Sequence, residues 1–160
     1  MKNALPYELY TISDSAYALS ASNFLINELG YIPKKAFITD NTPERYKDKI
    51  RSEFENIDDE YSDKVTFEID GGKIEKEIRS DKNTPRKTLI LGSQWEDDIA
   101  ADIKAPITYL GIPITNNLIL NKTYFGYNGG LRLIEDIYSS ILSDSLFNAR
   151  FVDCVEKNNY

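Results

Sequence analysis

The sequence predicts a three-layer α/β domain with a mostly parallel sheet of five strands. Strand-like and helical segments alternate along the 160 residues, and turn or capping sequences separate most of them. The strand-like segments are residues 7–12, 35–39, 65–69, 88–91 and 107–110, and the helical segments are residues 16–29, 44–57, 73–80, 95–101 and 127–146. A chain of this length is expected to form one domain over residues 1–160 with a sizeable core.

The first strand and helix are clearly delimited. Residues 7–12 are rich in aromatic and β-branched side chains, which favour strands. Ser13-Asp14-Ser15 follows, and each of these residues can cap a helix with a short side-chain oxygen. Residues 16–29 carry apolar residues at helical spacing. Gly30 is a suitable end for this helix because glycine adopts the left-handed conformation at little cost.

The second and third strand–helix pairs contain more charged residues. A strand over residues 35–39 leads into Asp40-Asn-Thr-Pro43, which is typical of a capped helix start with proline in the first turn. The following helix has a thin apolar stripe at Tyr46, Ile50, Phe54 and Ile57. Residues 65–69 alternate apolar and polar side chains, as in a half-exposed strand. We expect Asp70-Gly-Gly72 to form a turn before a short polar helix.

The last two pairs contain the most apolar strand and the longest helix. Residues 88–91 are largely apolar, which favours a central strand, whereas the alternating residues 65–69 favour an edge strand. A loop from Gly111 to Gly130 connects the last strand to the last helix. The helix is expected to be covered on two sides. One side carries Leu131, Ile134, Tyr138, Ile141 and Leu142, and another carries Leu133 and Ile137.

These assignments favour a Rossmann-like sheet with strand order 3-2-1-4-5. Its order reverses between the first and fourth strands, and ligands of such sheets bind at the carboxyl ends of the strands beside that point. The candidate ligand-binding residues there are Ser13, Asp14, Ser15, Gly92, Ser93 and Gln94. Helix capping and the helix dipole also account for these residues, and for Glu96, Asp97 and Asp98. A flavodoxin-like nucleotide protein is disfavoured because no phosphate-binding loop is visible.

Composition excludes several classes of function. The net charge of −7 argues against binding to nucleic acid or to an anionic membrane surface. No apolar run approaches the length of a membrane span. The chain has no His and a single Cys, Cys154, so neither a Cys–His pair nor a zinc or iron–sulfur site can be built from it. We expect a reducing, cytoplasmic location and no catalysis by the isolated chain.

Five segments together resemble the C-terminal domain of nitrogenase component 1, the molybdenum–iron protein family. They are DSAYALSASNFLINELG (14–30), ITDNTPE (38–44), LGSQWEDDIA (91–100), APITYLGIP (105–113) and YFGYNGGLRLIEDIY (124–138). The likeness extends from about residue 7 to residue 146 and is greater to the β-subunit type. Each motif is moderately specific, whereas their order and spacing make the combination fairly specific.

The resemblance implies one Rossmann-like domain of a larger subunit, so the sequence is expected to be a fragment of a multi-domain protein. Complete α and β subunits of the family contain an iron–sulfur P-cluster and an iron–molybdenum cofactor, and receive electrons from an iron protein. The cofactor's His ligand lies in the α-type loop that corresponds to residues 111–130. Because this loop has no His here, no metal-ligand role carries over to this chain.

The same loop is expected to contact another domain or subunit. The residues predicted to make this contact are Leu118, Ile119, Leu120, Tyr124, Phe125 and Tyr127. We therefore expect a domain of a nitrogenase-like oxidoreductase that supplies scaffold and subunit contacts. Its partners would be the rest of its subunit, a homologous subunit and, indirectly, the iron protein. The alternative is a diverged α/β binding or cofactor-assembly module without redox activity.

Overall fold

The computed structural model describes residues 7–81, 86–116, 118–119, 121–124 and 126–157; for residues 144–157 it describes the helical backbone alone. Within these residues, five parallel strands form one sheet in the order β3-β2-β1-β4-β5. The strands are β1 (Glu8–Ser13), β2 (Ile32–Ile38), β3 (Val65–Phe67), β4 (Thr88–Gly92) and β5 (Ile107–Tyr109). The predicted fold class and strand order are confirmed.

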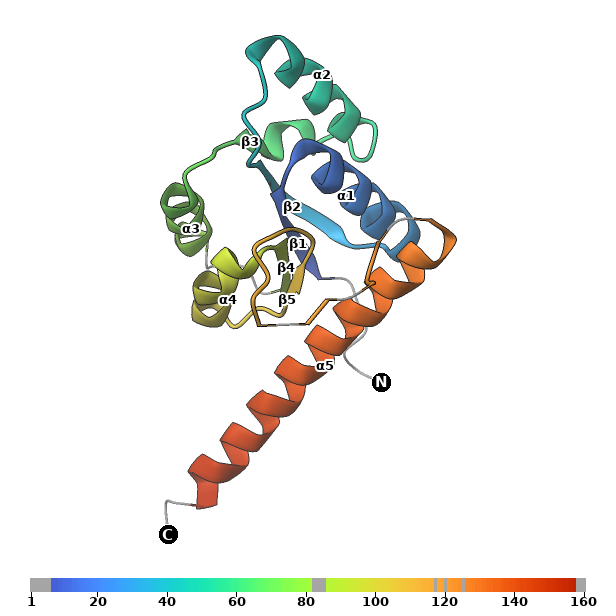
Figure 1. Cartoon of the computed structure of the whole chain (residues 1–160). Coiled ribbons are helices and arrows are strands. Elements are labelled where there is room, and N and C mark those ends of the chain that lie inside the picture. Colours follow the sequence, from blue (N-terminus) through green and yellow to red (C-terminus); the bar gives the residue numbers. More distant parts are fainter. Residues whose placement is uncertain (1–6, 82–85, 117, 120, 125, 158–160) are drawn as a thin grey trace.

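Helices cover both faces of this sheet (Figure 1). The α-helices are α1 (Ser15–Leu29), α2 (Glu44–Glu55), α3 (Gly71–Ser80), α4 (Asp97–Ile103) and α5 (Tyr127–Lys157), with short 3₁₀ turns η1 (Ser62–Lys64) and η2 (Gln94–Glu96). The buried clusters place α1, α2 and α5 on one face, and α3 and α4 on the other. The molecule therefore has the three layers that the sequence predicts.

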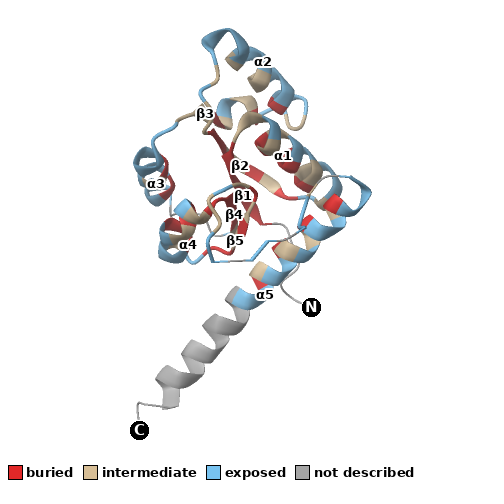
Figure 2. Ribbon diagram, viewed as in Figure 1, coloured by how far each residue is buried: buried red, intermediate tan, exposed pale blue. Residues whose placement is uncertain are grey.

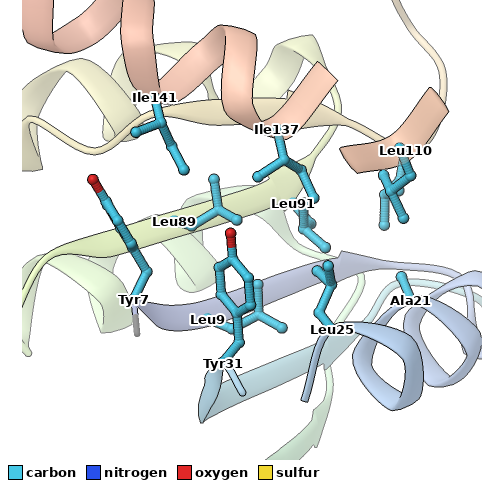
Figure 3. Packing of buried hydrophobic residues seen from close by; sticks show 11 residues of the cluster. Tyr7, Leu9, Ala21, Leu25, Tyr31, Leu89, Leu91, Leu110, Ile137 and Ile141 are labelled. Carbon is cyan, nitrogen blue, oxygen red and sulfur yellow. The ribbon is translucent and has the colours of Figure 1, made fainter. Parts of the chain in front are cut away.

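The core under α1 and α5 joins the two central strands to these helices (Figure 3). Leu9 of β1 and Leu89 and Leu91 of β4 are fully buried there, against Leu25 of α1 and Ile137 of α5. Full burial of such a side chain is worth about 1.5–3 kcal/mol. Strand β4 is apolar from Leu89 to Leu91 because it lies inside the sheet with both faces covered, as its sequence predicts.

Helix α1 begins and ends where its sequence predicts. The Asp14 carboxylate accepts hydrogen bonds from the backbone N–H groups of Ala16 and Tyr17. Gly30 has φ 71° and donates its N–H to the carbonyl of Ile26, which closes the last turn. These two caps are local, so the sequence determines them, whereas the N–H of Ser15 at the start of α1 is bound by Asp40 from the end of the next strand.

One predicted turn, one predicted cap and one predicted helix are corrected. Asp70-Gly-Gly72 is no free turn: Asp70 caps α3, and its carboxylate accepts the N–H of Gly72 at 2.9 Å. Asp40 does not cap α2, which begins after Pro43 without a side-chain hydrogen bond. The single helix predicted over residues 95–101 is instead η2 followed by α4. The starts of these helices differ from the prediction by at most two residues, and α2 begins at Glu44 as predicted, so the layer arrangement is unchanged.

Helix α5 is longer than predicted, and within the described residues it is covered on one side and not on the two sides predicted. Leu133, Ile137 and Ile141 are buried against the sheet, so Ile141 does not share a face with Leu131. Leu131 and Leu142 are 63% and 59% exposed, and Figure 2 shows the outer side of the helix as exposed. The sheet covers one side of α5 because only one stripe of residues along a helix can face a flat sheet. Among the described residues, no helix has the length and apolar character that crossing a membrane requires.

Candidate functional site

A pocket of about 480 Å³ opens at the carboxyl end of the sheet, beside the point where the strand order reverses. Ser13 and Asp14 line it from the end of β1, and Ser93 lines it from the end of β4. The structure thus brings together three of the six predicted ligand-binding residues, from two strands that are far apart in sequence. Ser15, Gly92 and Gln94 do not line the pocket, although they lie next to residues that do.

The N-terminus of α1, which faces this pocket, has no free backbone donor. Ala16 and Tyr17 donate to Asp14, Ala18 donates to the Asp14 carbonyl, and Ser15 donates its N–H to the Asp40 carboxylate at 2.8 Å. Burial opposes ionisation of Asp40, but hydrogen bonds from Thr42 and Ser15 outweigh it and lower the pKa of this carboxyl. A carboxylate of the chain itself therefore occupies the position that an external anion would take.

Glu96 is the third carboxylate at the pocket and, unlike Asp14 and Asp40, it is buried. Its Oε2 accepts the N–H of Ser93 at 2.6 Å and the Ser93 hydroxyl at 2.8 Å, in a capping box at the start of η2. Glu96 is 7% exposed, and burial raises its pKa. A Cβ at Gly92 would lie 2.8 Å from Glu96 Oε2, so a larger residue at this position would displace the Glu96 carboxylate. Gly92 and Ser93 thus position Glu96.

Gln94 holds the loop after β5 in place. Its backbone N–H donates to the Pro113 carbonyl at 3.0 Å, and its side-chain oxygen accepts from the N–H of Thr115 at 2.6 Å and from the Thr115 hydroxyl at 2.7 Å. The Ile112–Pro113 peptide bond in this loop is cis. Gln94 therefore fixes one wall of the pocket and leaves no side-chain oxygen for a ligand.

The donor set at this edge does not fit an iron–sulfur or iron–molybdenum cluster. Such clusters need Cys thiolates or His, and the chain has one Cys and no His. Among the described residues, no group of three or more His, Cys, Asp or Glu side chains could hold a metal ion. The pocket instead presents three carboxylates, Asp14, Asp40 and Glu96, which repel an anionic cofactor.

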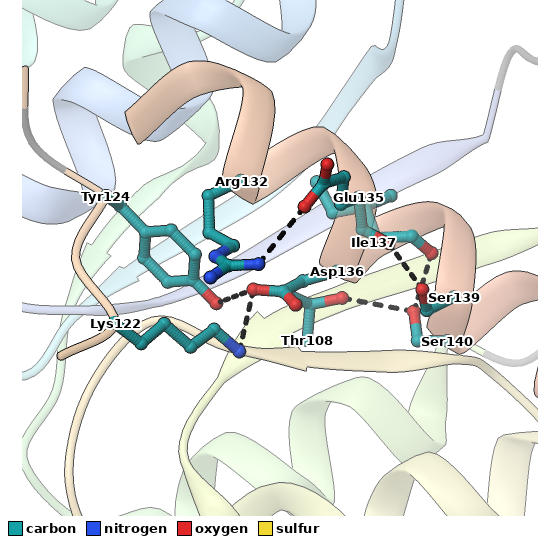
Figure 4. A network of polar contacts seen from close by, with 9 residues as sticks. All are labelled: Thr108, Lys122, Tyr124, Arg132, Glu135, Asp136, Ile137, Ser139 and Ser140. Carbon is teal, nitrogen blue, oxygen red and sulfur yellow. Dashed lines mark hydrogen bonds and ion pairs between the residues drawn. The ribbon is translucent and has the colours of Figure 1, made fainter. Parts of the chain in front are cut away.

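A second pocket, of about 440 Å³, lies between β5, the following loop and α5 (Figure 4). Asp136 of α5 accepts the Tyr124 hydroxyl at 2.7 Å and pairs with the Lys122 ammonium at 2.7 Å. Thr108 of β5 and Ser140 of α5 share a hydrogen bond of 3.1 Å. Burial raises the pKa of Tyr124, and the hydrogen bond to Asp136 raises it further. These contacts tie the loop to α5 and pair its charges internally.

Of the six residues predicted to contact a partner, four are described in the structure, and three of these are exposed. Leu118 is 87% exposed, Ile119 42% and Tyr127 104%. Tyr124 instead packs against the core under α1 and α5. Leu120 and Phe125 lie outside the described residues. The expected exposure of Leu118 and Ile119 is present in the structure, and the contact itself stays a prediction.

Sequence reasoning missed Asp40 and Glu96 as members of the pocket. The spacing of Ser93 and Glu96 matches a capping box, so this pair could have been found from the sequence. No local pattern joins Asp40 to Ser15, because 25 positions separate them and the parallel pairing of β1 with β2 brings them together.

Comparisons with known proteins agree with this fold. The model of the family described as nitrogenase component 1 type oxidoreductase matches residues 8–142. A solved structure described as nitrogenase Cp1 at pH 6.5 is similar, with a TM-score of 0.69 and 24% sequence identity. The match covers 86% of this chain and 29% of that chain, so the chain spans less than a third of the length of the matched protein. No curated protein matches the sequence.

Proposed function

Because the chain belongs to the nitrogenase component 1 type oxidoreductase family, we propose that it forms the C-terminal domain of a subunit of such an oxidoreductase. The proposed subunit is of the β type, and the domain supplies scaffold and subunit contacts without metal ligands of its own. The complete complex would act in nitrogen fixation or in a related metallocluster reduction. Its P-cluster and iron–molybdenum-type cofactor would supply electron transfer and reduction chemistry from other parts of the complex.

The chemistry of the chain supports a scaffold role. The α1 N-terminus is capped by Asp14 and Asp40, and Glu96 is engaged by Ser93. None of these groups is arranged to ligate a cluster, and their charge opposes an anionic one. In this proposal the polar groups at the carboxyl end of the sheet act on this domain's own backbone.

The exposed apolar stripe on α5 is the observation that carries the contact role. Tyr127, Leu131, Tyr138 and Leu142 follow one another at helical spacing, and they are 104%, 63%, 42% and 59% exposed. Large exposed apolar patches on a soluble domain are typical of sites that another protein covers. The stripe starts at the end of the loop that carries Leu118 and Ile119. We propose that the remaining domains of the subunit or a homologous component 1 subunit cover this surface, and that the iron protein is an indirect partner.

Anaerobic co-purification tests this proposal. The tagged protein is isolated from cells that also express candidate component 1 subunits, and we expect a co-purifying chain that itself matches the component 1 family, together with iron–sulfur absorbance. The double variant Leu118→Ser/Leu131→Ser should stay folded but should no longer co-purify with the partner chain. The matched control Tyr46→Ser, on the exposed side of α2, should retain it.

The same experiment separates the proposal from its alternative. A diverged α/β binding or cofactor-assembly module without redox activity would yield a preparation without iron–sulfur absorbance. A colourless, self-sufficient monomer from the full-length protein would contradict the subunit proposal. The loss of the partner chain in the control variant as well would show that the α5 stripe is not the contact.

A further inference from the structure

Three exposed apolar side chains surround the pocket at the carboxyl end of the sheet. Ile69 and Ile112 line it from the loops after β3 and β5, and Trp95 lines it from η2 after β4; the three side chains are 62%, 89% and 75% exposed, respectively. Water covers apolar surface at a free-energy cost of about 25 cal/mol per Å². This rim is therefore suited to burial against another molecule. It is a separate surface from the α5 stripe.

The walls inside this rim are acidic. The pocket of about 480 Å³ contains Asp14, Asp40 and Glu96, and an adjoining pocket of about 500 Å³ adds Glu75, Asp97 and Asp98. The two pockets share Trp95 and Glu96. No Lys or Arg is found among the described residues that line either pocket. Arg79 pairs with Glu75 at 3.4 Å from outside them, and within the described part of the chain the other five carboxylates make no ion pair.

Anions and metal ions do not match these observations. The N–H donors of α1 are already bound to Asp14 and Asp40, so an anion would gain no backbone hydrogen bond there and would meet three carboxylates. The carboxylates point to different N–H groups, and no described cluster could hold a metal ion. A cationic occupant matches the charge.

We propose that this edge is a docking surface for a protein segment that presents an arginine between apolar residues. The guanidinium would lie near Asp14, Asp40 and Glu96, where its planar donors suit carboxylates. It could also stack on the exposed Trp95 ring, a favourable cation–π arrangement. The flanking apolar residues would cover Ile69 and Ile112, which a free small cation would leave in water.

A peptide titration followed by amide NMR tests the proposal on the chain itself. The probes are N-acetyl-Leu-Arg-Leu-amide and the same peptide with citrulline, which keeps the shape and removes the charge. We expect the arginine peptide to shift the amide signals of Ser15, Trp95 and Ile112, and to bind at least about fivefold more tightly than the citrulline peptide, because charge complementarity favours it.

Amide variants separate the charge from the folding role of these carboxylates. Asp14→Asn keeps a good cap acceptor, and Glu96→Gln keeps the capping box, so both should fold and lose the preference for arginine over citrulline. The control Asp48→Asn makes the same change of net charge on the exposed side of α2. This control should keep the preference for arginine over citrulline. Trp95→Ala should weaken both peptides.

Four outcomes would overturn the proposal. Equal binding of the arginine and citrulline peptides would remove the charge argument. Binding of N-acetylarginine amide as tight as that of the tripeptide would indicate a small-molecule site. Shifts of the same amides by inorganic phosphate would indicate an anion site. Loss of the arginine preference in Asp48→Asn would indicate a non-specific effect of net charge. None of these outcomes depends on whether the chain belongs to a larger subunit.

Discussion

Glu96 shows how burial changes the chemistry of one side chain. The carboxylate is 7% exposed and is bound by Ser93, and burial raises its pKa above the usual 4.5. A carboxyl group with a raised pKa in the folded state holds its proton more tightly than the unfolded chain does. Stability therefore falls as the pH rises from about 4.5 through the folded-state pKa.

Glu96→Gln removes this ionisation and keeps an acceptor for Ser93. The variant should gain free energy of unfolding relative to the wild type as the pH rises above 4.5, and the gain should level off above the folded-state pKa. Urea unfolding at a series of pH values measures it. As a control, Glu96→Ala should be destabilised by about 1–3 kcal/mol because it leaves the buried Ser93 N–H without its acceptor. A pH-independent difference between Glu96→Gln and the wild type would contradict the burial argument.

Asp14 provides a test of capping at the same edge. Its carboxylate accepts two backbone N–H groups, so Asp14→Ala should lower the free energy of unfolding by about 1 kcal/mol. Asp14→Asn should stay near the wild-type value because asparagine caps a helix about as well. Chemical denaturation of both variants measures the difference. A wild-type stability for Asp14→Ala would mean that Asp40 and water suffice to cap α1.

At the scale of elements, α5 is the clearest case in which pattern and packing differ. The helix carries apolar residues on two sides, and the sequence does not say which side meets the sheet. The structure buries Leu133, Ile137 and Ile141, while Leu131 and Leu142 stay exposed. The loop before α5 is tied to it through Tyr124, Lys122 and Asp136, which fixes the rotation of the helix near Asp136.

The two sides of α5 should respond differently to truncation. Ile137→Ala should cost about 2–5 kcal/mol because it opens a cavity in the core, whereas Leu131→Ala should change stability by no more than about 0.5 kcal/mol. Urea unfolding of the isolated chain gives both values. A large cost at Leu131 together with a small cost at Ile137 would place the opposite face against the sheet.

At the scale of the whole molecule, the chain is expected to work as part of a larger assembly. It spans 29% of the matched nitrogenase chain, and it has no His and one Cys. Apart from Tyr46 on α2, the exposed large apolar side chains of the described residues form two groups, one along α5 and the loop before it and one around the acidic pocket. We therefore expect two different neighbours or two contacts with one neighbour.

The isolated chain should hold no stoichiometric iron. Iron–sulfur clusters are bound mainly by Cys thiolates, and the single Cys154 cannot provide a ligand set. Anaerobic purification followed by iron analysis and visible absorbance tests this, and the preparation that contains the partner chains is the comparison. Stoichiometric iron and a brown colour in the isolated chain would contradict it.

Local sequence patterns by themselves determined much of this protein. The alternation of segments and the contrast between residues 65–69 and 88–91 predicted the sheet and its order, because burial on one or two faces leaves a direct pattern in the sequence. The Asp14 cap and the Gly30 end of α1 were equally predictable, since their backbone partners are at most five residues away.

Only the tertiary structure decided the character of the carboxyl edge. The Asp40 carboxylate accepts the N–H of Ser15, which is 25 positions away in the sequence. Glu96 is buried in the folded chain. Ile69, Trp95 and Ile112 line one pocket from three separate segments. The tertiary structure also decided which face of α5 packs against the sheet. Contacts between distant residues depend on the whole fold and leave no periodic pattern along the chain, which is why sequence reasoning found the edge and missed its charge.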